Sequence, residues 1–254
     1  MDHLRSLPPE LFLIILDYVL GAEYEYPRQG ARYSTVSRQF QYFVERRIFK
    51  SLQIDNLCLR RALRLFRPAQ AHRKAFVRWL RFSIELPSYS FEDSTRVETE
   101  DEKEANSQVF SDAIHGLFRI LKSLDESEDL RNAGGLQCSM DTAPAPKSDR
   151  EFGTVDHEKR GSIRGKRSRA SLLRLRDAEQ LPAVSIVWRL HLGNWHGERY
   201  LDPLATMAIA TKLNRLRYAV LNCYDKDYLD IATRRTNRVG MEPRKLVDLQ
   251  ISFR

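Results

Sequence analysis

The 254-residue chain has only three cysteines, and their placement argues against both a disulfide-linked and a zinc-stabilised scaffold. Cys58, Cys138 and Cys223 lie far apart and form neither a Cys-x-x-Cys pair nor a Cys/His ligand pattern. We therefore expect neither a disulfide framework nor a zinc site, and a reducing compartment fits this usage. No apolar run reaches the about 18 residues of a membrane span, and the start lacks a secretory signal pattern. The sequence predicts a soluble protein of the cytoplasm, the nucleus or both, with no membrane partner.

Motifs that carry catalysis are also missing. No glycine-rich phosphate loop follows a strand-like segment, and no Gly-x-Ser-x-Gly elbow occurs. His191 and His196 are five residues apart, which matches neither a zinc-binding helix nor a pair of ligands on a strand. We therefore predict no catalytic residue, no metal site and no cofactor, and a protein that is not an enzyme.

The first fifty-four residues hold the most informative pattern. Leu7-Pro8-Pro9-Glu10-Leu11 opens a nearly all-apolar segment that extends to Leu20. Proline is tolerated in the first turn of a helix, and the helix dipole favours a carboxylate such as Glu10 there. A helix that is apolar all round needs apolar cover on more than one face. In a small three-helix unit, one of those faces is exposed unless a partner covers it.

Two further segments follow at close spacing. Tyr33, Val36, Phe40 and Phe43/Val44 recur every three to four positions, which predicts an amphipathic helix. Arg47-Ile48-Phe49 and then Leu52-Gln53-Ile54 close the region. The order of the three segments resembles an F-box, the docking module for the Skp adaptor of cullin–RING ubiquitin ligases. The plain alternative is a helical hairpin packed on its own domain.

The resemblance implies a function and a docking site. An F-box protein is a substrate-recognition subunit of a Skp–cullin–F-box type ubiquitin ligase, and its C-terminal region presents a protein target. The expected partners are thus the Skp adaptor, the cullin–RING ligase behind it and an unknown protein substrate, and nucleic acid is not expected. The positions implied to meet the adaptor, or to hold the helices that do, are Leu7, Pro8, Leu11, Ile14, Ile15, Val36 and Phe40.

The net charge of +8 is unevenly spread along the chain. Residues 159–176 contain eight Lys/Arg and no carboxylate. Its flexible basic patch consists of Lys159, Arg160, Arg164, Lys166, Arg167 and Arg169. Such a patch is a solvated insertion, a nuclear-import segment or a site for nucleic acid, and it can also contact the acidic run 98–104. The alternative function is therefore a nuclear nucleic-acid- or chromatin-associated protein that uses this segment.

Behind the F-box, strand-like and helix-like patterns alternate. Strands are predicted over residues 80–86, 136–140, 184–192 and 216–220, and helices over residues 59–66, 109–124 and 204–213. The last of these helices has a predicted apolar face of Leu204, Met207, Ala208 and Leu213, and the last strand has Leu216, Tyr218 and Val220. This order fits a doubly wound α/β sheet or a leucine-rich-repeat-like solenoid. The segment order is similar to fungal F-box proteins with a degenerate solenoid, which favours the second.

The predicted fold is therefore α+β or α/β, with a three-helix F-box and a short strand–helix solenoid. The predicted divisions are 1–54 (F-box), 55–140 (first strand–helix units), 141–178 (basic, disordered insertion), 179–235 (a further unit) and 236–254 (tail). Alternate residues of a strand face one side. The predicted core positions include Leu80, Phe82, Ile84, Val184, Ile186, Trp188 and Leu190. Ser83 and Ser185 then share the outer face with the predicted target-binding residues Arg81, Glu85, Arg189 and His191.

Overall fold

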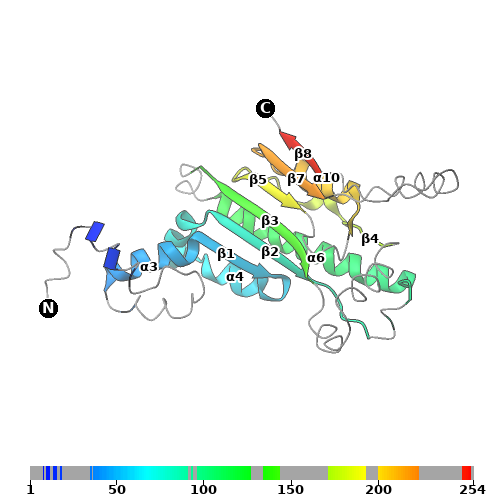
Figure 1. Ribbon diagram of the computed structural model, residues 1–254, viewed down its shortest axis with the longest axis horizontal. Coiled ribbons are helices and arrows are strands. Elements are labelled where there is room, and N and C mark those ends of the chain that lie inside the picture. Colours follow the sequence, from blue (N-terminus) through cyan, green and yellow to red (C-terminus); the bar gives the residue numbers. More distant parts are fainter. Residues whose placement is uncertain are drawn as a thin grey trace.

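The computed structural model describes residues 8, 10–11, 14–15, 18, 35, 37–90, 93, 96–126, 134–143, 171–192, 200–222 and 248–252. Its α-helices are α3 (Arg38–Lys50), α4 (Leu59–Leu65), α6 (Glu100–Asp125) and α10 (Pro203–Thr211), and its 3-10 helices are η2 (Asn56–Cys58), η3 (Pro68–Phe76) and η5 (Ala178–Gln180). Its strands are β1 (Ser51–Asp55), β2 (Trp79–Glu85), β3 (Leu136–Ala143), β4 (Leu172–Leu173), β5 (Val187–Leu192), β6 (Tyr200–Leu201), β7 (Tyr218–Asn222) and β8 (Asp248–Ser252). Figure 1 shows these elements along the chain.

A six-stranded sheet organises the molecule, in the order β1-β2-β3-β5-β7-β8. The first five strands are parallel to their neighbours, and β8 pairs antiparallel with β7. The short strands β4 and β6 form a separate parallel pair. The strands of the large sheet therefore lie side by side in chain order. The mixed α/β class with a parallel sheet is confirmed.

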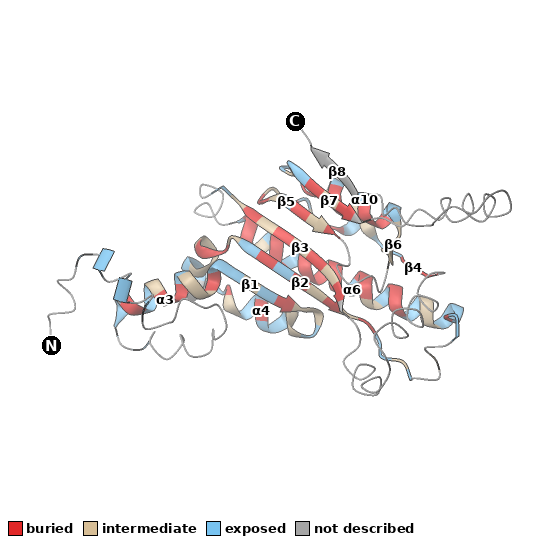
Figure 2. Ribbon diagram, in the orientation of Figure 1, coloured by how far each residue is buried: buried red, intermediate tan, exposed pale blue. Residues whose placement is uncertain are grey.

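One face of the large sheet is buried against helices, and the other is open (Figure 2). In β2, Leu80, Phe82 and Ile84 are buried. Trp79, which precedes Leu80, and Arg81, which follows it, are exposed. Leu136, Cys138 and Met140 of β3 are buried in the same way. Both strands follow the predicted alternation: their buried apolar residues occupy every second position, and Trp79 of β2 lies on the other side.

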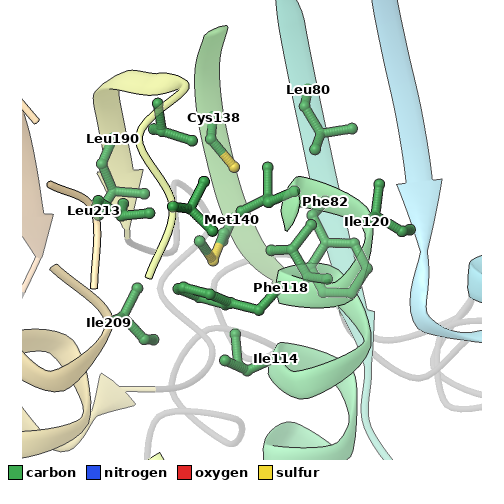
Figure 3. Packing of buried hydrophobic residues seen from close by; sticks show 14 of the residues in the cluster. Leu80, Phe82, Ile114, Phe118, Ile120, Cys138, Met140, Leu190, Ile209 and Leu213 are labelled. Atoms are coloured by element: carbon green, nitrogen blue, oxygen red, sulfur yellow. The ribbon is translucent and has the colours of Figure 1, made fainter. Parts of the chain in front are cut away.

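Helix α6 supplies the main cover of the buried face, and it lies behind the sheet in Figure 1. Thr99 caps its start by accepting from the Glu102 backbone N–H, and the Glu102 side chain bonds back to the Thr99 N–H. This capping box begins the helix at Glu100, nine residues before the predicted start at residue 109. Figure 3 shows side chains of this helix, among them Ile114 and Phe118, meeting those of the strands.

Helix α4 begins and ends as the sequence predicts. Asp55 accepts a hydrogen bond from the Cys58 N–H at 2.7 Å and so caps the turn that leads into α4. The helix ends before Pro68. It lies tightly against α6, since a Cβ built on Gly116 would fall 2.5 Å from Leu59 Cδ1. A larger side chain at Gly116 would require the Leu59 side chain to move.

The predicted apolar face of α10 is wrong in part. That prediction comprised Leu204, Met207, Ala208 and Leu213. Asp202 caps the helix by accepting from the Leu204 N–H at 2.9 Å. However, Leu204 is 78% exposed and Met207 is 51% exposed, while Ala205 and Ile209 are buried. Ala205, Ile209 and Ala210 therefore form the buried apolar side of α10, and two large apolar side chains face solvent.

The predicted facing of β5 and β7 also needs correction. The pairing of β3 with β5 goes from Leu136–Val187 to Gln137–Arg189, so Trp188 is an extra residue in the ladder. Trp188 is half-buried instead of a core residue. In β7 the buried residues are Ala219 and Leu221, and Tyr218 is 51% exposed.

Several strands lie across the predicted divisions. β1 spans the border between residues 54 and 55, where the sequence predicts the end of the F-box. β4 and η5 lie within or next to the predicted insertion 141–178, of which residues 144–170 are outside the described residues. The Arg174 N–H donates to Ser107 Oγ at 3.3 Å, and the Arg176 N–H donates to Ser111 Oγ at 2.9 Å. The C-terminal end of that segment is thus fixed on α6, and β8 adds a strand within the predicted tail.

Candidate docking and target-binding surfaces

An apolar stripe lies exposed near the N-terminus. Leu11, Ile14, Ile15 and Tyr18 are helical. Their spacing of three, four and seven residues places them on one face of a helix. Leu11 is 49% exposed, Ile14 64%, Ile15 39% and Tyr18 89%. An uncovered row of large apolar side chains is typical of a protein-interaction site.

The other predicted adaptor-binding residues differ in placement. Pro8 is exposed, while Leu7 and Val36 lie outside the described residues. Phe40 is buried and packs with Val44 in a small cluster of its own. Phe40 is therefore placed to hold α3, and it does not contribute exposed surface.

The Val-Ser-Arg segment sets the start of α3. Ser37 accepts a hydrogen bond from the Phe40 N–H at 3.2 Å, which makes it the N-cap. The helix therefore begins at Arg38, and Tyr33 and Val36 of the predicted stripe precede it in the chain. Serine is a preferred N-cap residue, so Ser37 was a signal in the sequence for this helix start.

A buried carboxylate joins α3 to η3. Glu45 is 5% exposed, and Arg73 Nη2 donates to its Oε1 at 2.7 Å. His72 Nε2 lies 2.7 Å from Glu45 Oε2, and Gln41 Nε2 donates to Oε1 at 3.1 Å. Burial alone would raise the pKa of Glu45, but these hydrogen bonds lower it to about 2. The carboxylate is thus ionised at neutral pH, and it links α3 to η3, the 3-10 helix that precedes β2.

The predicted target-binding residues lie together on the open face of the sheet. Arg81 pairs through Ser139 of β3 with His191 of β5, which places all three in one row. Arg189 lies in the neighbouring row, and Glu85 is at the end of β2 with the same facing. Arg189 and His191 face the open side because Leu190 and Leu192, which alternate with them in β5, are buried.

Contacts on this face distinguish the two arginines. Arg81 Nε donates to Asp141 Oδ2 of the neighbouring strand at 3.0 Å. Arg189 is exposed and has no ion-pair partner among the residues that the structure describes. Ser185, predicted to share this face, instead donates from Oγ to Asp125 Oδ1 at 2.7 Å, at the end of α6. It therefore lies on the helix side.

Two aromatic residues lie on this face without having been predicted there: Trp79 was not among the predicted surface residues, and Tyr218 was predicted on the apolar side of its strand. Trp79 and Tyr218 are 50% and 51% exposed. They occupy one row of the sheet, Trp79–Gln137–Arg189–Tyr218, in which each residue is the register partner of the next. The Tyr218 ring also meets the Trp188 ring edge-on at 6.0 Å between centroids. Trp79 directly precedes the buried Leu80, so the alternation of β2 already placed it outward.

The basic segment is largely outside the described part of the chain. Lys159, Arg160, Arg164, Lys166, Arg167 and Arg169 are not among the described residues. At its C-terminal end, Arg176 forms an ion pair with Glu104 and donates to Gln108 Oε1 at 2.8 Å. The anticipated contact between the basic segment and the acidic run therefore exists, with the acidic run forming the first turns of α6.

Known proteins give no direct guide to these surfaces. In the described ranges, no three His, Cys, Asp or Glu side chains gather as a metal site, and no helix is long and apolar enough to cross a membrane. Burial raises the pKa of the Cys138 thiol to about 12, so this cysteine stays protonated.

No family model, no curated protein and no solved structure matches the chain significantly.

Proposed function

We propose that the chain is a substrate-recognition subunit of a Skp–cullin–F-box type ubiquitin ligase. The observation that carries the proposal is the exposed stripe of Leu11, Ile14, Ile15 and Tyr18. It lies in the segment whose sequence resembles the first helix of an F-box. Covering an apolar side chain of this size contributes about 1.5–3 kcal/mol, so the adaptor is a suitable partner for the stripe.

We also propose that the strands and helices behind it form a short leucine-rich-repeat-like solenoid. The parallel strands follow one another in chain order. A doubly wound sheet instead reverses its strand order at a switch point, where ligands bind. Side chains of α4, α6 and α10 enter one core with those of the strands. Each strand–helix unit then needs its neighbour to complete this core.

The open sheet face is the proposed target-binding surface. Arg189 is exposed there, between Gln137 and Tyr218 in the register. Trp79 and Tyr218 add apolar area at either end of the same row. Tryptophan, tyrosine and arginine are the side chains that most often dominate protein interfaces. This composition supports a protein target.

Adaptor docking is testable with a double variant, Leu11→Ala plus Ile14→Ala. Both side chains are exposed, so their truncation leaves the described core intact. Each contributes about 1.5–3 kcal/mol when covered, so the dissociation constant for the Skp adaptor should rise at least about a hundredfold. Calorimetric titration of the purified proteins measures this change.

The matched control is Leu204→Ala plus Met207→Ala, an equally exposed apolar pair on α10. This control should bind the adaptor like the wild type. Unchanged adaptor affinity in a folded Leu11/Ile14 variant would contradict the docking proposal. Circular dichroism of both variants checks that each is folded.

Target binding is testable by reversing charge on the open face with Arg81→Glu plus Arg189→Glu. The change replaces two guanidinium groups on one surface and sets a carboxylate beside Asp141. Proteins ubiquitinated by the reconstituted wild-type ligase should be lost from the products, while adaptor binding stays intact. Arg119→Glu, an exposed change on α6, is the control. An unchanged product set from the double variant would remove the open face as the target site.

A further inference from the structure

The outward face of α4 is made of arginines. The helix buries Ala62 against the core and is followed by the buried Phe66. Arg60, Arg61 and Arg64 are exposed. Arg60 and Arg64 are four residues apart, so they share one stripe of the helix. The result is a row of arginines on α4, the helix that follows β1 at the edge of the sheet.

This arrangement opposes two local electrostatic preferences of a helix. Like charges four residues apart repel each other, as Arg60 and Arg64 do. Cations in a first turn oppose the helix dipole, and Arg60 and Arg61 lie there with no acidic residue in that turn. Helix α6 follows the opposite rule and begins with Glu100, Asp101 and Glu102. Positions that break local rules without internal compensation are typical of binding sites.

Few carboxylates lie near this surface in the sequence. Residues 37–86 contain twelve Lys/Arg and only three carboxylates, Glu45, Asp55 and Glu85. Glu45 is bound to Arg73 and His72, and Asp55 caps the turn before α4. Glu85 lies on the open face of β2, with the facing of Arg81. Among the described residues, none is ion-paired with Arg60, Arg61 or Arg64.

We propose that the arginine face of α4 binds the phosphate backbone of a nucleic acid. Protein interfaces are depleted of charge at their centres, whereas nucleic-acid interfaces are strongly positive. Guanidinium groups match phosphate oxygens in pairs. Arg60 and Arg64 are about 6 Å apart along the helix axis, close to the about 7 Å rise of two nucleotides in one strand. The inference does not depend on adaptor docking, and it differs from the expectation that nucleic acid is no partner.

A membrane surface fits this helix less well. Membrane-bound helices insert an apolar face below their basic one. The apolar face of α4 is already packed in the core, through Ala62 and the adjoining Phe66. The exposed apolar side chains beside the arginines are Leu57 and Leu63, 74% and 36% exposed. Two leucines provide too little area for a stable protein interface, which takes about 800 Å² from each partner.

The test compares the double variant Arg60→Glu plus Arg64→Glu with Arg215→Glu plus Arg217→Glu. The four arginines are exposed, so both variants change the net charge equally. Binding of labelled duplex DNA and of labelled single-stranded RNA is measured by fluorescence anisotropy over a salt series. In the α4 variant, the slope of log affinity against log salt should fall by about 0.9 per arginine on the duplex and about 0.7 on the single strand. The control should keep the wild-type slope.

The same experiment decides against the proposal in three ways. The proposal fails if the wild-type protein binds neither nucleic acid at low salt, or if both variants lose affinity for nucleic acid equally. It also fails if vesicles containing phosphatidylserine bind the protein and nucleic acid does not. The thermal midpoint of the α4 variant should stay close to that of the wild type, because both substituted side chains are exposed and the pair keeps two like charges four residues apart. If that variant does not fold, Arg60→Gln plus Arg64→Gln replaces it in the same comparison.

Discussion

Replacing Phe118 by alanine is expected to lower the free energy of unfolding by about 3–5 kcal/mol. Phe118 is fully buried in the middle of α6. Figure 3 shows its ring reaching from the helix into the layer that Phe82 and Met140 enter from the sheet. The truncation removes apolar contacts and leaves a cavity that the rigid sheet fills only in part. Urea denaturation followed by circular dichroism measures the change.

The neighbouring residue provides the control for this prediction. Arg119 is exposed on the same helix. Arg119→Ala should change the free energy of unfolding by less than about 0.5 kcal/mol. A domain of ordinary stability has about 5–15 kcal/mol in total, so the Phe118 variant should be marginal at physiological temperature. Equal stabilities of the two variants would mean that α6 does not pack on the sheet as described.

Replacing Glu45 by alanine is expected to destabilise the protein by about 3 kcal/mol, because it removes one partner of a buried ion pair. Arg73 would keep its charge within the joint between α3 and η3 but lose the carboxylate at 2.7 Å. The Arg73 guanidinium also lies 5.1 Å from the Phe49 ring centroid, so its displacement disturbs the end of α3. Thermal and urea unfolding at neutral pH measure the loss.

The joint also predicts a pH dependence. Folding lowers the pKa of Glu45 from its ordinary 4.5 to about 2. The ionised carboxylate therefore stabilises the fold above about pH 4.5, and this contribution is lost as the pH falls toward about 2. Glu45→Gln should be less stable than the wild type at neutral pH, and the difference should shrink over this acid range. Glu179→Gln, an exposed change, should follow the wild-type profile at every pH.

Periodicity predicted an element well wherever only one face was apolar. β2 alternates Leu80, Phe82 and Ile84 with polar residues, and its burial follows that alternation. The 3.6-residue period likewise predicted the core side of α6. β1 carried the same signal in Ser51-Leu52-Gln53-Ile54-Asp55, but this segment was assigned to the end of the F-box pattern. The strand was not predicted because the segment also matched the F-box pattern, although its alternation was clear.

Elsewhere the sequence did not contain the information needed. Every residue of α10 except its two threonines is apolar or proline, so its period does not single out a face. In the structure, the buried apolar residues of α10 are Ala205, Ile209 and Ala210. In β7, Tyr218, Ala219, Val220 and Leu221 are apolar at both parities, so alternation could not choose between them. The extra residue at Trp188 depends on the pairing with β3, which residues far away in the chain determine.

The candidate surfaces divide along the same line. The open face of the sheet followed from strand alternation, so Arg81 and Arg189 were placed together before their neighbours were known. The exposure of Ile14 required knowledge of what covers the N-terminal helix, which depends on tertiary packing. The arginines of α4 were not predicted as a binding surface, because exposed charges are ordinary on a helix. The proposal for them depends on the structure, in which no described carboxylate is ion-paired with Arg60, Arg61 or Arg64.

The chain-order arrangement of the sheet bears on synthesis at the ribosome. Each parallel strand of the large sheet pairs with the strand of that sheet made before it, as Trp79 of β2 does with Ser51 of β1. Translation proceeds at about 5–20 residues per second, so β1 waits only a few seconds for its partner to emerge. Every later parallel strand meets a finished edge and extends it. The nascent protein can therefore assemble in the direction of translation, and no central strand has to be inserted between two older ones.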